Sequence, residues 1–277
     1  MEPVPRLCLL ENVKSLKDVS KTTGCSNYDA VKTAFESLGF TFVSKEFNAS
    51  QTGIPNRRPR LYMAAIAGLS AEMEKGLASR VETSMDSMLQ RVKHRPLSDF
   101  LLDDFVPADT IKDWMPELSR PRCNRDLQKE LPKMAACPCA SEEHHYRRHL
   151  EGNVWFEWLS HRERHMLLWH LCHYTFPGPQ EGVVELQCSE KFMRLVPGPV
   201  MPCQVPNALF WLLGRDRLLT GAEALMLQGV DLGAIRGFSV DSAPSRFLQN
   251  LAGNAFCVYQ FLLMFVACLP EVPSRDA

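Results

Sequence analysis

The sequence has no excess of charge of either sign. Its 277 residues include 31 Lys and Arg against 32 Asp and Glu, a formal net charge of -1. This balance excludes a wholly basic protein that coats nucleic acid, so any surface that binds anions must be local. With 45% hydrophobic and 23% charged residues, the chain has the composition of a globular protein and is neither disordered nor collagen-like.

Targeting segments and long hydrophobic runs are also missing. Residues 1–15 contain an acidic residue and only a short apolar stretch, which does not fit a signal peptide. The longest apolar run, 255–269, is interrupted by Gln260 and is short for a membrane span, so we expect a buried helix there. The ten cysteines are scattered, which favours reduced thiols. These features predict an intracellular protein without a membrane part.

The beginning of the chain predicts part of an α/β sheet. Strands are expected at 6–13, 40–43 and 61–66, and a helix at 30–38. The first strand is apolar on both faces and ends near Glu11, as a strand does in a parallel sheet whose carboxyl end opens onto a site. Residues 1–69 are too few for a complete doubly wound domain, so we interpret them as a partial catalytic α/β region.

The remainder divides into two further expected regions. Residues 70–213 contain many prolines and clustered His and Arg without β-α alternation, which indicates an irregular insert. Residues 214–277 close the chain. There Thr220 and Glu223 form a capping box that opens a short helix. An apolar helix from about Asn254 to Leu269 is expected to pack back on the sheet, because its apolar side chains must be buried.

Four segments, in this order, resemble the second half of the DNA cytosine-5 methyltransferases. They are LLENV at 9–13, GIPNRRPRLYMAAI at 53–66, RLLTGAEALMLQGVD at 217–231 and LAGNAFCVYQFLLMF at 251–265. The resemblance covers about 6–69 and 186–269. It implies a partial Rossmann-like sheet of an S-adenosylmethionine-dependent methyltransferase, with 70–213 as a target-recognition lobe that faces double-stranded DNA.

The chemistry of that family explains the residue types. Cytosine C5 is a poor nucleophile, so a cysteine thiolate adds at C6 and places charge on N3. The resemblance implies that Glu11 hydrogen-bonds N3 and the exocyclic amine, that Arg58 and Arg60 lie near the flipped base and its phosphates, and that Asn254 lies beside S-adenosylmethionine. Asn56 stands where the family has Gln. Taken alone, Glu11 would be a solvated strand end and the two arginines a solvated basic turn.

Two motifs of the family's first half are missing ahead of Glu11. These are the Phe-x-Gly-x-Gly loop for the cofactor and the Pro-Cys-Gln loop that provides the nucleophile. A Pro-Cys-Gln sequence at 202–204 lies inside the insert, so we do not assign Cys203 as the nucleophile. We therefore expect no methyl transfer by this chain alone. A truncated gene model, one subunit of a split enzyme, a permuted enzyme and a non-catalytic DNA-binding module all stay open, as do the target sequence and DNA versus RNA.

The insert contains candidate DNA-binding and metal-binding residues. Four arginines lie beside aromatic residues and are suited to phosphates, although nearby glutamates fit a solvated helix face equally well: Arg147, Arg148, Arg162 and Arg164. Five potential zinc ligands have spacings that match no strong finger pattern, so no metal is assigned: Cys123, Cys137, Cys139, His144 and His145. The implied partners are DNA and a second chain or segment with the missing half, and the implied compartment is the nucleus.

Overall fold

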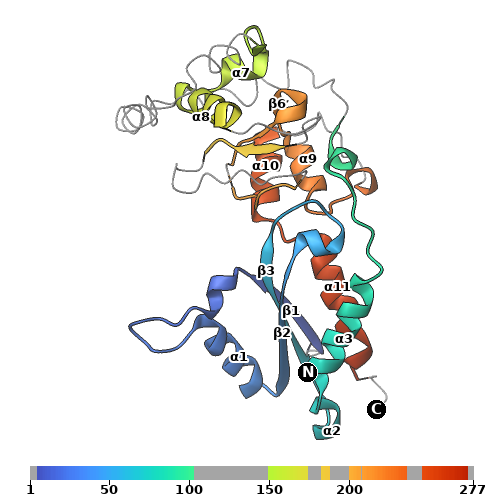
Figure 1. The fold of residues 1–277 in the computed structure, drawn as a ribbon. Coiled ribbons are helices and arrows are strands. Elements are labelled where there is room, and N and C mark those ends of the chain that lie inside the picture. The colour runs from blue at the N-terminus through green and yellow to red at the C-terminus, as the bar shows by residue number, and fades with distance from the viewer. Residues whose placement is uncertain are drawn as a thin grey trace. The chain divides into compact units, whose positions relative to one another are not determined.

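The computed structural model describes residues 5–102, 149–173, 182–187, 200–206, 208–235 and 245–273. The chain is mixed α/β (Figure 1), which confirms the predicted class. It forms two compact units, residues 1–95 with 256–277 and residues 96–255. These units divide the chain differently from the three expected ranges. The helices that follow the first sheet join the first unit, whereas 214–255 belongs to the second.

A three-stranded sheet forms the centre of the first unit. Its strands are β1 (Leu7–Asn12), β2 (Phe40–Asn48) and β3 (Pro59–Ala67), in the order β1-β3-β2. Both outer strands pair antiparallel with β3, so β1 and β2 run in the same direction. The expectation of a parallel neighbour for β1 is wrong within the described residues. The chain reverses after β2, and the returning strand β3 takes the position between β1 and β2.

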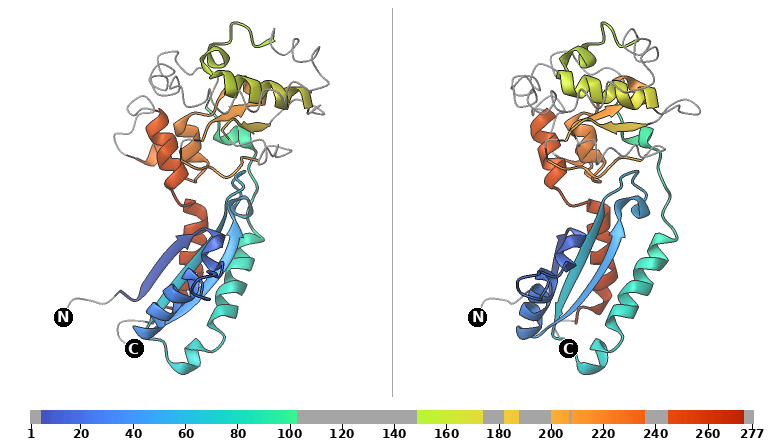
Figure 2. Two further views of the ribbon diagram at one scale, coloured as in Figure 1. Left: turned by 90° about the vertical axis from the view of Figure 1, so that its left-hand side faces the viewer. Right: turned by 60° about the vertical axis from the view of Figure 1, so that its left-hand side comes forward.

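Helices cover both faces of this sheet (Figure 2), which explains why its strands are apolar on both sides. On one face lies α1 (Asn27–Ser37), which begins with a Ser26–Asp29 capping box and packs Tyr28 against Phe42. On the other face lie α3 (Leu77–Leu89) and α11 (Val258–Cys268). Their buried side chains share one core with those of the strands: Val43, Phe47, Tyr62, Ala64, Ile66, Leu77, Val81, Met85, Met264, Ala267 and Cys268.

Shorter elements connect these parts of the first unit. They are the 3-10 helices at Lys14–Lys17, Ala49–Thr52 and Leu269–Glu271, and the four-residue α2 (Ala71–Glu74). Gly53 follows the second of them with a φ of 87°, in the left-handed region that favours glycine. This residue begins the loop that leads into β3.

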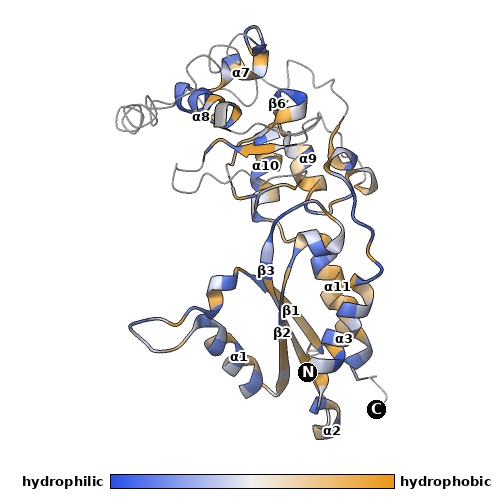
Figure 3. Ribbon diagram, viewed as in Figure 1, coloured by the Kyte–Doolittle hydropathy of each residue, from blue (hydrophilic) through white to orange (hydrophobic). Residues whose placement is uncertain are grey.

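The apolar helix expected from about Asn254 to Leu269 is present as α11 and begins at Val258, and a separate helix, α10 (Ser245–Asn254), precedes it. By length and composition alone, 245–271 could cross a membrane. In the structure the helix is interrupted at 255–257, and α11 buries one side against the first sheet. Figure 3 shows this helix as largely hydrophobic. Its other side exposes Tyr259, Leu262 and Val266, and Leu269 just after the helix is also exposed.

The second unit contains a smaller antiparallel sheet and several helices. Its strands are β4 (Val183–Glu185), β5 (Phe210–Leu212) and β6 (Arg217–Leu218), in the order β4-β5-β6. Its helices are the 3-10 helices Leu97–Phe100, Leu213–Arg215 and Leu232–Ala234, with α7 (Val154–Trp158), α8 (His161–His173), α9 (Gly221–Met226) and α10. The fully buried Trp211 lies at the centre of its core.

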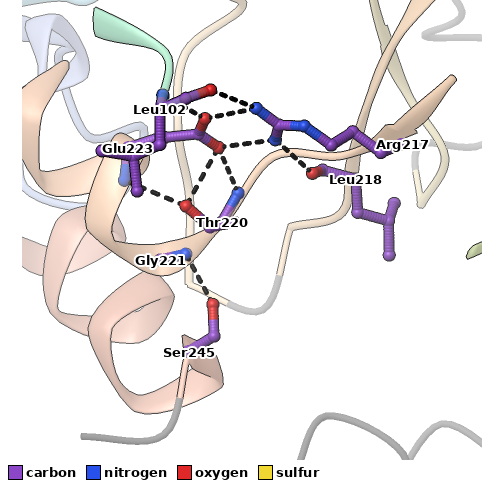
Figure 4. A network of polar contacts seen from close by, with 7 residues as sticks. All are labelled: Leu102, Arg217, Leu218, Thr220, Gly221, Glu223 and Ser245. Atoms are coloured by element: carbon purple, nitrogen blue, oxygen red, sulfur yellow. Dashed lines mark hydrogen bonds and ion pairs between the residues drawn. The ribbon is translucent and has the colours of Figure 1, made fainter. Parts of the chain in front are cut away.

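A buried ion pair fastens α9 to its surroundings (Figure 4). The Arg217 guanidinium donates to both carboxylate oxygens of Glu223, at 2.7 and 2.9 Å. Glu223 also accepts from the backbone and hydroxyl of Thr220, which is the capping box expected from the sequence. Both backbone groups of Leu102 join the network. The motif at 217–223 therefore has a structural role within the second unit.

Candidate functional site

Glu11 and Arg60 meet on one face of the first sheet. Glu11 lies opposite Tyr62 in the β1–β3 register, and Arg60 is two residues before Tyr62, so all three side chains share a face. Arg60 Nε lies 2.9 Å from Glu11 Oε1, with side chains 12% and 20% exposed. The contact has the distance of an ion pair, yet no described donor hydrogen-bonds Oε1. Oε1 is buried against Arg60, so the exposed part of the Glu11 side chain lies at its other atoms.

The loop before β3 is fixed by backbone and side-chain contacts. The Asn48 side-chain oxygen accepts from the Arg58 backbone at 2.8 Å, and Ala49 donates to the Arg58 carbonyl. Arg58 and Asn56 are buried, at 3% and 0% exposed. A solvated basic turn is therefore wrong for Arg58, whose side chain is buried beside the 3-10 helix Ala49–Thr52. Asn56, the shorter amide in the glutamine position, is also enclosed.

Three residues that sequence reasoning passed over complete the surroundings of Glu11 and Arg60. The Tyr62 hydroxyl donates weakly to the Cys257 carbonyl and to Gln260 Oε1, each at 3.5 Å. Gln260 Nε2 donates to the Phe47 carbonyl at 2.9 Å, which anchors the start of α11 to the sheet. The sequence contains a feature that could have identified two of these three residues. Tyr62 follows Arg60 at the period of a strand, and Gln260 is a polar residue within an apolar run.

The electrostatics of this cluster favour neutral side chains at Tyr62 and Cys257. Burial raises the pKa of Tyr62, and the nearby Cys257 and Glu11 raise it further against the opposing effect of Arg58 and Arg60. Burial likewise raises the pKa of the Cys257 thiol, although backbone donors, Thr52 and Arg58 oppose that rise. A thiol must be deprotonated to act as a nucleophile, so Cys257 is unsuited to that role.

Two other candidates belong to the second unit. Asn254 ends α10 with an exposed side chain whose amide donates to the Asn250 carbonyl at 3.0 Å. The preceding Gly253 has no room for a side chain, because an added Cβ would lie 2.4 Å from the Pro206 backbone. Cys203 is partly buried, and the next residue, Gln204, accepts a 2.9 Å hydrogen bond from Gln228. The Pro-Cys-Gln sequence is thus built into the structure of this unit.

The arginines proposed for DNA binding are only partly within the described residues. Arg164 stacks over the Phe156 ring at 5.5 Å and donates to the Glu157 carbonyl, so its guanidinium is engaged inside the protein. Arg162 is half-buried on α8. Nearby Glu163 is buried and caps the same helix through Ser160. Arg147 and Arg148 lie outside the described residues.

No metal centre is found within the described ranges. No group of three or more His, Cys, Asp or Glu side chains there could hold an ion. The cysteines and histidines of the insert that were considered for zinc, at 123, 137, 139, 144 and 145, lie outside those ranges.

Comparison with known proteins gives one family and two similar structures. The model of the C-5 cytosine-specific DNA methylases matches residues 2–166, more than half of the chain. This range includes the motifs at Glu11 and Arg58 but not the segments at 217–231 and 251–265. A search of curated proteins gives no match.

Two solved structures are similar at low identity. One is the Dnmt2 methyltransferase of S. pombe, with 12% identity and a TM-score of 0.49, over 98% of this chain and 68% of that one. The other is the methyltransferase EhMeth of Entamoeba histolytica, with 12% identity and a TM-score of 0.43, over 98% of this chain and 64% of that one. The chain therefore spans about two thirds of the length of each.

Proposed function

Because the chain belongs to the C-5 cytosine-specific DNA methylase family and is thus of methyltransferase type, we propose that it provides the base-binding half of a DNA cytosine-5 methyltransferase. The reaction would move a methyl group from S-adenosylmethionine to C5 of a cytosine flipped out of duplex DNA. The observation that carries this proposal is the Glu11–Arg60 pair at the carboxyl end of β1.

Glu11 suits the recognition of cytosine because its side chain is a carboxyl group that is partly exposed. When protonated on one oxygen, its carboxyl group can donate to N3 while the other oxygen accepts from the exocyclic amine. Arg60 orients this carboxyl group and offers further guanidinium donors to O2 or to a phosphate. The buried Arg58 adds positive charge beside Tyr62. This charge would stabilise the negative charge that develops on the cytosine during the reaction.

The methyl donor has less support among the described residues. The exposed Asn254 amide is bonded to its own helix, and no glycine-rich loop accompanies it. Asn254 stays a proposed contact of S-adenosylmethionine that rests on the resemblance alone. The use of this methyl donor by the protein rests on the family and on the methyl group that the reaction needs.

Two features of the first unit support the proposal that a partner supplies the cofactor loop and the nucleophile. Within the described part of the chain, β1 has a hydrogen-bonded neighbour on one edge only. Leu7 and Leu9 of this strand pack against the same core as α11, whose other side exposes apolar residues. An open strand edge beside an exposed apolar helix is a surface that another polypeptide segment can complete. We propose that this segment carries the first half of the catalytic region.

A non-catalytic DNA-binding module is the second candidate. It is favoured by Cys257, a buried thiol beside Tyr62 whose pKa is raised by burial and which is therefore unsuited to act as a nucleophile. Under either proposal double-stranded DNA is the partner and the nucleus is the compartment. Arg162 and the undescribed Arg147 and Arg148 stay proposed phosphate contacts, whereas Arg164 is already engaged with Phe156.

The test compares the purified chain with the protein isolated under native conditions from its source. Each preparation is incubated with methyl-labelled S-adenosylmethionine and a cytosine-containing duplex, and the nucleosides are then separated. We expect 5-methyldeoxycytidine from the native assembly and none from the chain alone. DNA binding without methylation by the native assembly would favour the non-catalytic module. Methylation by the chain alone would overturn the assignment of the nucleophile to a partner.

A further inference from the structure

Two segments of the first unit are rich in positive charge and contain no acidic residue. Residues 49–60 include Arg57, Arg58 and Arg60, and residues 87–95 include Arg91, Lys93 and Arg95. The first segment leads directly into the strand that holds Arg60 beside Glu11. The second begins in the last turn of α3 and continues beyond it, where Figure 3 shows the chain as hydrophilic.

Gly53 brings the backbones of these two segments together. The Arg95 backbone donates to the Gly53 carbonyl at 3.0 Å. A Cβ added at Gly53 would lie 2.6 Å from the Lys93 carbonyl oxygen, closer than any side chain allows. The glycine therefore permits a backbone contact that places the second basic segment against the loop before β3.

The outer cations of this junction are free to bind an external anion. Arg57, Arg91 and Lys93 are exposed, and none forms an ion pair with a described acidic residue. The nearby acids are already engaged: Lys45 pairs with Glu82 and Asp86, and Arg60 pairs with Glu11. The net local charge is therefore positive in a chain whose total charge is -1.

We propose that Arg57, Arg91 and Lys93 form a phosphate-binding surface that holds the nucleic-acid backbone next to the Glu11–Arg60 site. This inference rests on the proposed function. Arg57 is three residues from Arg60, so their Cα atoms are at most about 11 Å apart, the length of about three base-pair steps. A strand whose base reaches Glu11 would bring its flanking phosphates to this surface. Cations at such spacing suit a phosphate backbone, which they bind regardless of sequence.

The experiment measures binding of the full chain to a labelled cytosine-containing duplex at several KCl concentrations by fluorescence anisotropy. The test variant combines Arg57→Gln, Arg91→Gln and Lys93→Gln. The matched control combines Lys21→Gln, Lys32→Gln and Lys75→Gln, which removes three charges of the same unit from the loop before α1, from α1 and from the end of α2. Circular dichroism verifies that both variants fold.

We expect the magnitude of the negative slope of log K against log salt concentration to decrease by about two to three in the test variant. Each lost phosphate contact reduces that magnitude by about 0.9. The control slope should stay at the wild-type value, and Arg91→Gln alone should account for about one third of the change. An unchanged slope in the test variant overturns the inference and leaves the proposed function standing. Tighter binding of the wild type to phosphatidylserine vesicles than to the duplex also overturns it. If the slope decreases in the test variant but the native assembly transfers no methyl group, the phosphate-binding surface is supported and the proposed methyltransferase activity is contradicted.

Discussion

Arg217 and Glu223 form a two-pronged ion pair with almost no contact with solvent. Their side chains are 4% and 0% exposed, and two hydrogen bonds join them. Removing one partner from such a pair leaves a buried charge without compensation, which costs far more than the net contribution of the intact pair. The motif that resembles the methyltransferases at 217–223 is therefore explained by folding of the second unit.

We expect Arg217→Met to destabilise the second unit by about 3–5 kcal/mol. All five tryptophans fall between 114 and 211, so tryptophan fluorescence during urea unfolding reports on this unit. The double variant Arg217→Met with Glu223→Gln should recover much of the loss, because it removes both charges and keeps a side-chain oxygen that accepts from Thr220 or Leu102. A loss below about 1 kcal/mol in the single variant would mean that the pair is not buried in solution.

Gly221 lies at a close approach between α9 and α10. An added Cβ there would meet the Ser245 carbonyl oxygen at 2.0 Å and Leu248 Cβ at 2.6 Å. Gly221→Ala should therefore separate these helices and destabilise the second unit by about 1–3 kcal/mol, the usual cost of overpacking. Gly233→Ala is the matched control, since its Cβ would meet only the Asp231 side chain at 3.3 Å. Equal urea midpoints for the two variants would contradict the packing of α9 on α10.

The buried hydroxyl of Tyr62 should stay protonated at high pH. Its pKa in the folded protein is raised above the usual value of about 10. The resulting stabilisation is complete below pH of about 10 and is lost as the pH rises toward the folded-state pKa. We therefore expect Tyr62→Phe to leave the native absorbance change at 295 nm near pH 10–11 unchanged. In urea the same substitution should remove one fifth of the signal, because the chain has five tyrosines. A smaller native signal in the variant would place Tyr62 in contact with water.

Local chemistry made several elements predictable from the sequence. The apolar pattern and Gly39 located the first helix and the strands around it, and Thr220 with Glu223 located the start of α9. The pairing of β1 was not predictable in the same way. A strand that is apolar on both faces fits a parallel or an antiparallel neighbour, and only the return of β3 between β1 and β2 decides between them.

The candidate site was predictable where a motif fixed residue types, and less so where distant segments meet. Glu11 and Arg60 follow from their motifs, and the strand register then brings them together. Cys257 and Gln260 lie about 200 residues further along the chain, and packing of α11 brings them to Tyr62. The apolar helix expected from about Asn254 begins only at Val258, because 255–257 separate it from α10, and hydropathy did not indicate that separation.

The most direct test of the base-binding role is the rate of methyl transfer by the native assembly with Glu11→Gln. This change keeps the size of the side chain but removes its charge and its ability to donate from a carboxyl group. Loss of one transition-state hydrogen bond is worth roughly 3 kcal/mol, so we expect a rate about a hundredfold lower. The exposed Glu82→Gln, which alters only the Lys45 contact, should leave the rate within twofold of the wild type. A Glu11→Gln enzyme as fast as the Glu82→Gln control would contradict the assignment of Glu11 to the cytosine.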